Sequence, residues 1–144
     1  MDNESKKTTW EHFEHKADIG IRGVAPTLAQ AFEQAALAMT AVICDPALIL
    51  EQQSVTIRCE GSDNEFLFLD WINELIYIMA VRGLLFKRFQ VTIDAGVLTA
   101  TAYGEPVDRK KHRPAVEIKG ATLTELCVRL LADGNWVAQC VVDV

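Results

Sequence analysis

Hydrophobic and polar residues alternate along the first part of the chain. The apolar series is Phe13, His15, Ala17, Ile19 and Ile21, and it is interleaved with Glu14, Lys16, Asp18 and Arg22. A period of two predicts one half-buried strand, with Asp18 on its more polar face. His15 and Asp18 are three positions apart and would point to opposite faces of a regular strand. A shared site would need a bulge or a strand end between them.

A capping signal and helical periodicity follow this strand. Thr27 and Gln30 have the spacing of a capping box, and apolar residues then recur at helical spacing until Asp45-Pro46. Because proline disfavours helical geometry in the preceding residue, we expect a helix of about 17 residues that ends there.

A second helix is predicted in the middle of the chain. Ser62 and Glu65 form another capping box, the following residues are strongly apolar through position 81, and Gly83 fits the left-handed position after the helix. The helix also carries one polar stripe, which we interpret as a solvated face: Asp70, Asn73, Glu74 and Tyr77.

The remaining segments have strand patterns. We predict strands over 54–60, 84–94, 97–103, 115–119, 123–131 and 135–143, with a polar loop over 104–113. Early helices with late antiparallel hairpins indicate an α+β fold, a single-domain sandwich of one mixed or antiparallel sheet with two packed helices. No linker interrupts residues 10–144, and residues 1–9 are expected to form a flexible polar arm.

Composition and charge argue against two classes of protein, those that bind nucleic acid by bulk electrostatics and those that span a membrane. The 144 residues carry a net charge of −6, which is the wrong sign for binding nucleic acid by bulk electrostatics, so strong direct binding of RNA is not expected. No apolar stretch approaches the roughly 20 residues that span a bilayer, and no secretory leader is present, so we expect a cytoplasmic protein without membrane contact. The basic residues of segment 109–113 could bind phosphate or an acidic partner, although we favour the interpretation that this segment is a solvated loop.

The four cysteines lack the paired spacing of a zinc or thioredoxin-like site. If Asp133-Gly134 is a two-residue hairpin turn, Cys127 lies opposite Cys140 at a separation that a disulfide can bridge. Without a secretory signal, we expect two packed, reduced thiols there.

Two aspartates interrupt apolar runs and could share a cation. Asp18 lies within Ala17 to Ile21, and Asp143 lies among terminal valines. Two adjacent carboxylates repel unless a proton or cation lies between them, and Val144 could supply a further oxygen. Solvated aspartates are the alternative. Lys119 is expected on the polar face of its strand, and His15 is expected to be a half-buried, hydrogen-bonded histidine.

Six ordered segments resemble the archease family. They are residues 15–21 (HKADIGI), 68–77 (FLDWINELIY), 83–86 (GLLF), 104–106 (GEP) with Asp108 and His112, 117–119 (EIK) and 142–144 (VDV). The resemblance covers nearly everything after the polar arm. It implies an accessory protein, not an enzyme, that activates the GTP-dependent RNA-splicing ligase by promoting guanylylation of a ligase histidine and restoring multiple turnover. That ligase joins 3′-phosphate or cyclic-phosphate ends of RNA to 5′-hydroxyl ends with manganese.

The resemblance also assigns site residues. The family's metal site matches Asp18, Asp143 and a carbonyl of Val144, and its functional lysine matches Lys119. His15 matches the first position of the opening motif. A calcium-like oxygen site is implied, in which manganese or magnesium could act. The family commonly reads Ala-Val-Thr-Tyr-His after the lysine, whereas this chain has Leu123 and Thr124 in place of the Tyr-His pair.

The resemblance suggests a mechanism and leaves alternatives open. A cation near Lys119 could enter the ligase active site and reposition manganese and the GTP phosphates. A chaperone-like modulator of a tRNA methyltransferase is the second hypothesis. An independent metal-dependent hydrolase is the third; the lack of an obvious general base beside the aspartates counts against it, although His15 could serve if a bulge turned it inward.

Overall fold

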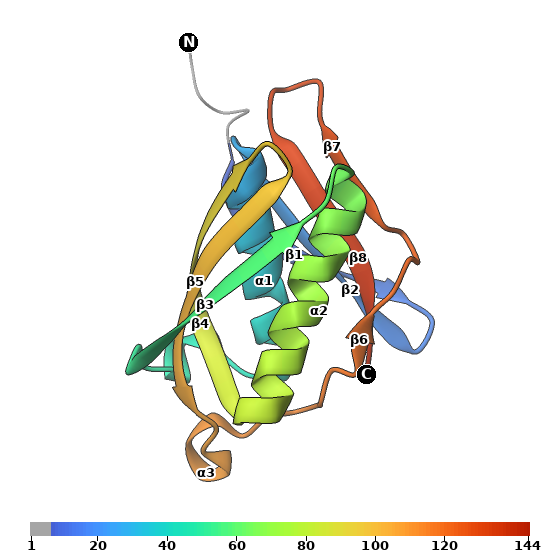
Figure 1. The fold of residues 1–144 in the computed structure, drawn as a ribbon. Coiled ribbons are helices and arrows are strands. Elements are labelled where there is room, and N and C mark those ends of the chain that lie inside the picture. Colours follow the sequence, from blue (N-terminus) through green and yellow to red (C-terminus); the bar gives the residue numbers. More distant parts are fainter. Residues whose placement is uncertain (1–6) are drawn as a thin grey trace.

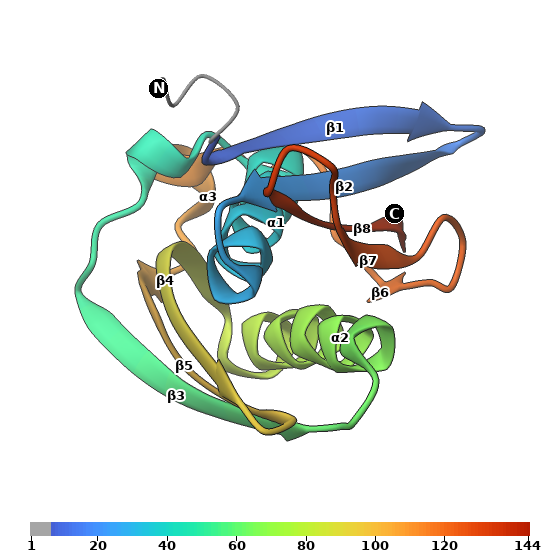
Figure 2. The same ribbon diagram turned by 90° about the horizontal axis from the view of Figure 1, so that it is seen from above.

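The computed structural model describes residues 7–144, and the first six residues of the predicted arm lie outside this range. The strands form two antiparallel sheets, with helices between them (Figures 1 and 2). Sheet A contains β1 (Thr9–His15), β2 (Asp18–Ala25), β8 (Trp136–Asp143), β6 (Gly120–Ala121) and β7 (Cys127–Leu130). Sheet B contains β3 (Gln53–Glu60), β5 (Val97–Pro106) and β4 (Leu84–Asp94). The helices are α1 (Leu28–Ile43), the short 3-10 helix η1 (Pro46–Leu48), α2 (Asn64–Arg82) and α3 (Arg109–His112).

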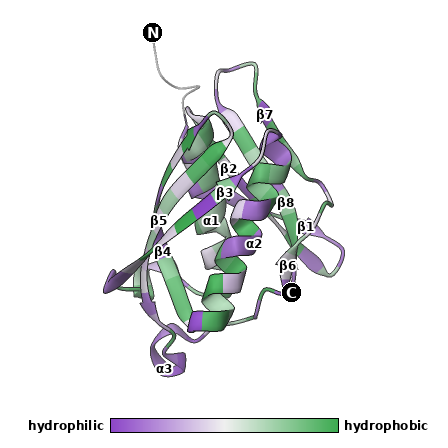
Figure 3. Cartoon of the chain, in the orientation of Figure 1, coloured by the Kyte–Doolittle hydropathy of each residue, from purple (hydrophilic) through white to green (hydrophobic). Residues whose placement is uncertain are grey.

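The predicted α+β class is confirmed, but the strands form two sheets instead of one. Both α1 and α2 contact strands of each sheet, so apolar residues of both helices meet those of both sheets in one core. Figure 3 shows this hydrophobic interior and the hydrophilic α3 outside it. Gly23 allows β2 to pack directly on α1, because a side chain there would clash with the Ala31 carbonyl. None of the helices within residues 7–144 is long and apolar enough to cross a membrane.

The helix boundaries follow the capping signals closely. The Thr27 hydroxyl accepts a hydrogen bond from the Gln30 N–H at 3.1 Å, as predicted for the start of α1. The second helix is capped by Asp63 instead of Ser62, because its carboxylate reaches the N–H groups of both Glu65 and Phe66. Gly83 ends α2 in the left-handed conformation with φ of 63°, which only glycine adopts at little cost.

The C-terminal hairpin departs from its predicted register by one residue. Residues 131–135 form a five-residue connection in place of the two-residue turn, so Cys127 lies opposite Gln139, and Cys140 belongs to the other face of the sheet. The predicted Cys127 and Cys140 pairing is therefore wrong, and all four cysteines are free. Burial raises the pKa of the Cys140 thiol to about 12, which makes it unreactive.

The segment before β6 also differs from the prediction. Residues 113–119 cross the end of the molecule without regular secondary structure, and the strand expected over 115–119 is absent. The Ala115 N–H donates to the Ile43 carbonyl at 2.8 Å, which ties this segment to the end of α1. Only two residues, Gly120 and Ala121, pair with β8 as a strand.

The predicted polar loop 104–113 is partly ordered by a buried ion cluster. Glu105, 4% exposed, accepts hydrogen bonds from the Lys111 ammonium at 2.7 Å, the Leu50 N–H at 2.9 Å and the His112 ring at 2.9 Å. These donors, Lys111 above all, lower the pKa of the Glu105 carboxyl to about 2. Since the other ring nitrogen of His112 accepts from the Asp108 N–H, the cluster holds α3 onto β5. Glu105 and His112 thus have a structural role here.

Candidate functional site

His15 and Asp18 face each other across the tip of a hairpin. The predicted single strand over residues 13–22 is wrong, because the chain reverses at Lys16 and Ala17 and Lys16 takes a left-handed φ of 55°. His15 and Asp18 are paired in the resulting register, and directly opposed residues project from the same face of a sheet. A strand end does lie between them, as a shared site requires. Both side chains are half-buried.

The adjacent strand brings Asp143 to the same end of sheet A. β2 and β8 pair from Ala25 with Trp136 to Ile19 with Val142, so the next position in this register sets Asp18 beside Asp143. The Val144 N–H also donates to the Asp18 carboxylate at 3.4 Å. The register therefore brings together both predicted metal-ligating aspartates and the residue expected to add a carbonyl.

Lys119 lies on the other side of β8 from Asp18, beside Asp143. Its N–H donates to the Asp143 carbonyl at 2.7 Å, and the next residue, Gly120, pairs with Asp143 in the sheet. Its side chain is exposed, as expected, although Lys119 lies just before β6 and not within a longer strand. We call Asp18, Asp143, Val144 and Lys119 the sheet-end cluster. His15 borders it across the hairpin.

The oxygen atoms of the cluster suit a hard cation, but they are too few to complete its coordination shell. Asp18, Asp143 and the Val144 carbonyl can offer only oxygen atoms, which calcium, magnesium and manganese prefer. Within residues 7–144, no group of three or more His, Cys, Asp or Glu side chains has a metal-binding arrangement. Two carboxylates and one carbonyl fall short of the six or more ligands that such ions take, so water or another molecule would have to complete the set. Asp143 is exposed and is accessible to such a molecule.

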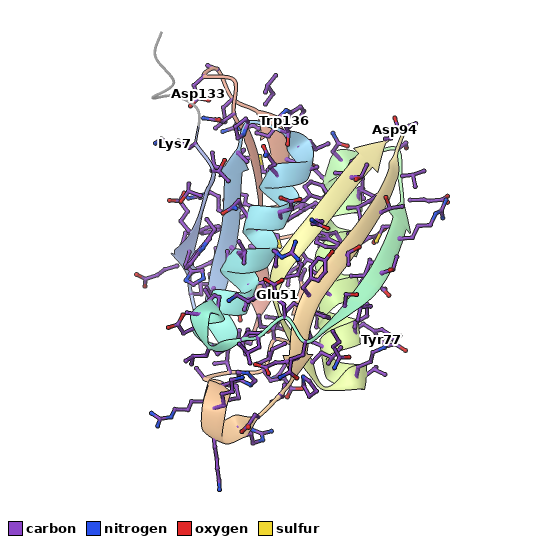
Figure 4. All side chains as sticks on the ribbon, turned by 90° about the vertical axis from the view of Figure 1, so that its left-hand side faces the viewer. Lys7, Glu51, Tyr77, Asp94, Asp133 and Trp136 are labelled. Carbon is purple, nitrogen blue, oxygen red and sulfur yellow. The ribbon has the colours of Figure 1, made fainter. Side chains whose placement is uncertain are left out.

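One residue near the cluster was misinterpreted from the sequence. Asp70, Glu74 and Tyr77 are exposed, as predicted for a solvated stripe, and Figure 4 shows Tyr77 on the outside of α2. Asn73 is half-buried instead, and its side-chain oxygen accepts a hydrogen bond from the Ala121 N–H of β6 at 2.9 Å. Helical periodicity places Asn73 beside two exposed carboxylates, and nothing in that pattern distinguishes it from them.

Comparison with known proteins identifies relatives along almost the whole chain. Residues 10–144 match the model of the Archease protein family (MTH1598/TM1083). The protein archease of Pyrococcus furiosus is 42% identical over 94% of this chain and 98% of its own length. That of Methanosarcina acetivorans is 36% identical over the full length of both chains.

Two solved structures share the fold. The solution structure of Methanobacterium thermoautotrophicum protein 1598 matches with a TM-score of 0.82 and 32% identity over 94% of this chain and 98% of that one. A Thermotoga maritima archease, described as a possible chaperone, matches with a TM-score of 0.59 and 19% identity over 93% of this chain and 96% of that one. The family match and the identities to the archaeal proteins show that the chain belongs to the archease family.

Proposed function

We propose that this archease is an accessory protein that activates the GTP-dependent RNA-splicing ligase, with no catalytic centre of its own. One observation carries the proposal. Three segments that are distant in sequence place Asp18, Asp143 and Lys119 at one end of sheet A. In this proposal the cluster acts inside the ligase, where it promotes guanylylation of the ligase histidine and allows repeated turnover.

The cluster contains two carboxylates and one ammonium group, and in this proposal both kinds of group act on a partner. Asp18 and Asp143 would bind a divalent cation together with the Val144 carbonyl, and a partner would complete the ligand set. The bound cation would supply positive charge that orients phosphoryl groups. The Lys119 ammonium, which is exposed and has three N–H donors, would bind a phosphate or a carboxylate of the partner. His15 would border the contact from the neighbouring strand.

A chaperone-like modulator of a tRNA methyltransferase is the second candidate. It is favoured by the description of the Thermotoga maritima relative as a possible chaperone. This function would need no cation at the cluster, so the two candidates predict different effects of Asp18→Asn. An independent metal-dependent hydrolase would instead act on RNA ends in the absence of any partner.

The test is an assay of the purified protein alone and with the ligase of the same organism. We expect the protein alone to leave RNA ends unchanged, and expect it to accelerate both transfer of labelled GMP to the ligase and joining of excess RNA. Asp18→Asn, Asp143→Asn and Lys119→Ala should lose most of this acceleration. Asp94→Asn is the matched control, because Asp94 is an exposed carboxylate at the opposite end of the molecule (Figures 1 and 4). No acceleration by the unmodified protein, or an equal loss in the control, would refute the proposal.

A further inference from the structure

Two polar side chains of α2 bind the outermost segments of sheet A. β6 and β7 are short, and both pair with β8, so together they act as one interrupted edge strand. Asn73 accepts a hydrogen bond from the Ala121 N–H of β6 at 2.9 Å. Glu65 accepts one from the Val128 N–H of β7 at 3.3 Å. Each strand is thus bonded to β8 on one side and to α2 on the other.

The two contacts restrain different parts of the edge. Glu65 and Asn73 are eight positions apart, which corresponds to about 12 Å along the helix axis. Glu65 therefore acts on the strand that leads to the C-terminal hairpin, whereas Asn73 acts on the strand that directly follows Lys119. The Asn73 oxygen also lies over Gly120, where an added Cβ atom would be 3.7 Å away.

We infer that Asn73 is a positioning residue for Lys119. A strand of two residues has few backbone hydrogen bonds, and on either side of it the Lys119 and Thr122 N–H groups donate to the Asp143 and Val141 carbonyls of β8. The Asn73 side chain adds a bond on the other side, so the short strand is fixed between α2 and β8. The Lys119 backbone is then held beside Asp143, while its ammonium stays exposed. Without Asn73, β6 loses its hydrogen bond to α2, and the Lys119 backbone, still bonded to the Asp143 carbonyl, is held less firmly relative to the aspartates.

The chemistry of the contact defines the variants. Because the donor is a backbone N–H, the acceptor must be the side-chain oxygen of Asn73, and aspartate can offer the same oxygen. Leucine has a similar size and no acceptor. Asn73→Leu should remove the restraint and Asn73→Asp should keep it. Glu65→Ala is the matched control, because it removes the equivalent bond to Val128 at the far end of the same edge.

The experiment measures amide hydrogen exchange of the full chain by NMR, together with activation of the ligase. In Asn73→Leu, we expect exchange of the Ala121 amide to rise by about fivefold to tenfold, the factor equivalent to the loss of one net hydrogen bond. Maximal activation should fall by a comparable factor, with little change in the concentration that gives half of it, because the ammonium is misplaced but not removed. Asn73→Asp should restore near-normal values of both. Glu65→Ala should speed exchange of Val128 and leave activation intact.

The activation readout rests on the proposed function, whereas the exchange readout does not. An unchanged exchange rate of Ala121 in Asn73→Leu overturns the inference. Faster exchange with full activation also overturns it, provided that Lys119→Ala is inactive. If Lys119→Ala itself activates the ligase normally, the proposed role of the lysine is wrong, and the restraint of β6 by Asn73 is decided by the exchange data alone.

Discussion

Replacing Asp143 by asparagine should separate cation binding from folding. The Asp143 side chain is exposed, and the backbone of this residue is held independently by its carbonyl bond to the Lys119 N–H and by pairing with Gly120. The substitution leaves both of these backbone contacts in place. Without metal, we therefore expect the free energy of unfolding to change by no more than about 0.5 kcal/mol. Relief of the repulsion from the Asp18 carboxylate shifts this change towards stabilisation.

Added metal should then distinguish the two proteins. A cation at 100 times its dissociation constant stabilises the folded state by about 2.7 kcal/mol. With an unfolding entropy of about 2.1 cal/mol/K per residue, a chain of 144 residues should gain about 9 °C in Tm. If loss of one carboxylate weakens binding about 100-fold, the same metal concentration adds only about 0.4 kcal/mol, or between 1 and 2 °C.

The assay is differential scanning calorimetry with and without calcium, magnesium or manganese, and with Asp94→Asn as control. The control should retain the full increment, because Asp94, labelled in Figure 4, lies at the other end of the molecule from the C-terminus marked in Figure 1. An equal metal-induced rise in Asp143→Asn and the unmodified protein would refute cation sharing by the two aspartates. Absence of any increment in the unmodified protein, for all three metals, would do the same.

Four further predictions follow from single residues. Lys119→Ala should abolish most ligase activation while changing the unfolding free energy by no more than about 0.5 kcal/mol in urea titrations, because the side chain is exposed. A large loss of stability would make the lysine structural. Because the pKa of Glu105 is lowered from 4.5 to about 2, its ionised form stabilises the fold at pH above 4.5, and this contribution is lost as the pH falls towards 2. Protection factors of the amides in residues 107–113 should fall over that window in the unmodified protein and show no such step in Glu105→Gln. Trp71→Phe should cost about 2 to 3 kcal/mol in urea titrations, since the indole is 0% exposed and donates to a backbone carbonyl, whereas Trp10→Phe, at 36% exposure, should cost far less. Cys127→Ser should leave activation unchanged under reducing and oxidising conditions, and activity that follows thiol oxidation would contradict this.

The sequence predicts local structure better than register. Thr27 and Gly83 mark helix ends through backbone conformations and hydrogen bonds that depend on a few neighbouring residues, and both are found where expected. The last hairpin depends on the length of its connection, which Asp133-Gly134 does not reveal. Since strand side chains alternate between faces, an error of one position in the predicted register placed Cys127 and Cys140 on the same face, whereas they lie on opposite faces.

The residues of the candidate site could be named from the sequence, but their arrangement in space could not. The family resemblance supplied Asp18, Asp143 and Lys119, and the interruption of apolar runs supported both aspartates. The turn at Lys16 and Ala17 was missed because it contains no glycine, asparagine or proline and because apolar and polar residues alternate straight through it, although the turn places residues 15 and 18 on the same face. The contact of Asn73 with β6 depends on the tertiary arrangement of α2 and the sheet, about which helical periodicity carries no information.

The pairing of β2 with β8 also has a kinetic consequence. These strands are more than a hundred positions apart in the chain, yet they are neighbours in the middle of sheet A. Such non-local pairing requires closure of a very long loop, whereas the β1–β2 hairpin, the β4–β5 hairpin and the helices need only local contacts. An intermediate with these local units alone would have Asp18 in its hairpin turn and Asp143 elsewhere, so it could not hold a cation between them. Assembly of the sheet-end cluster is therefore tied to the highest-contact-order step in the folding of this chain.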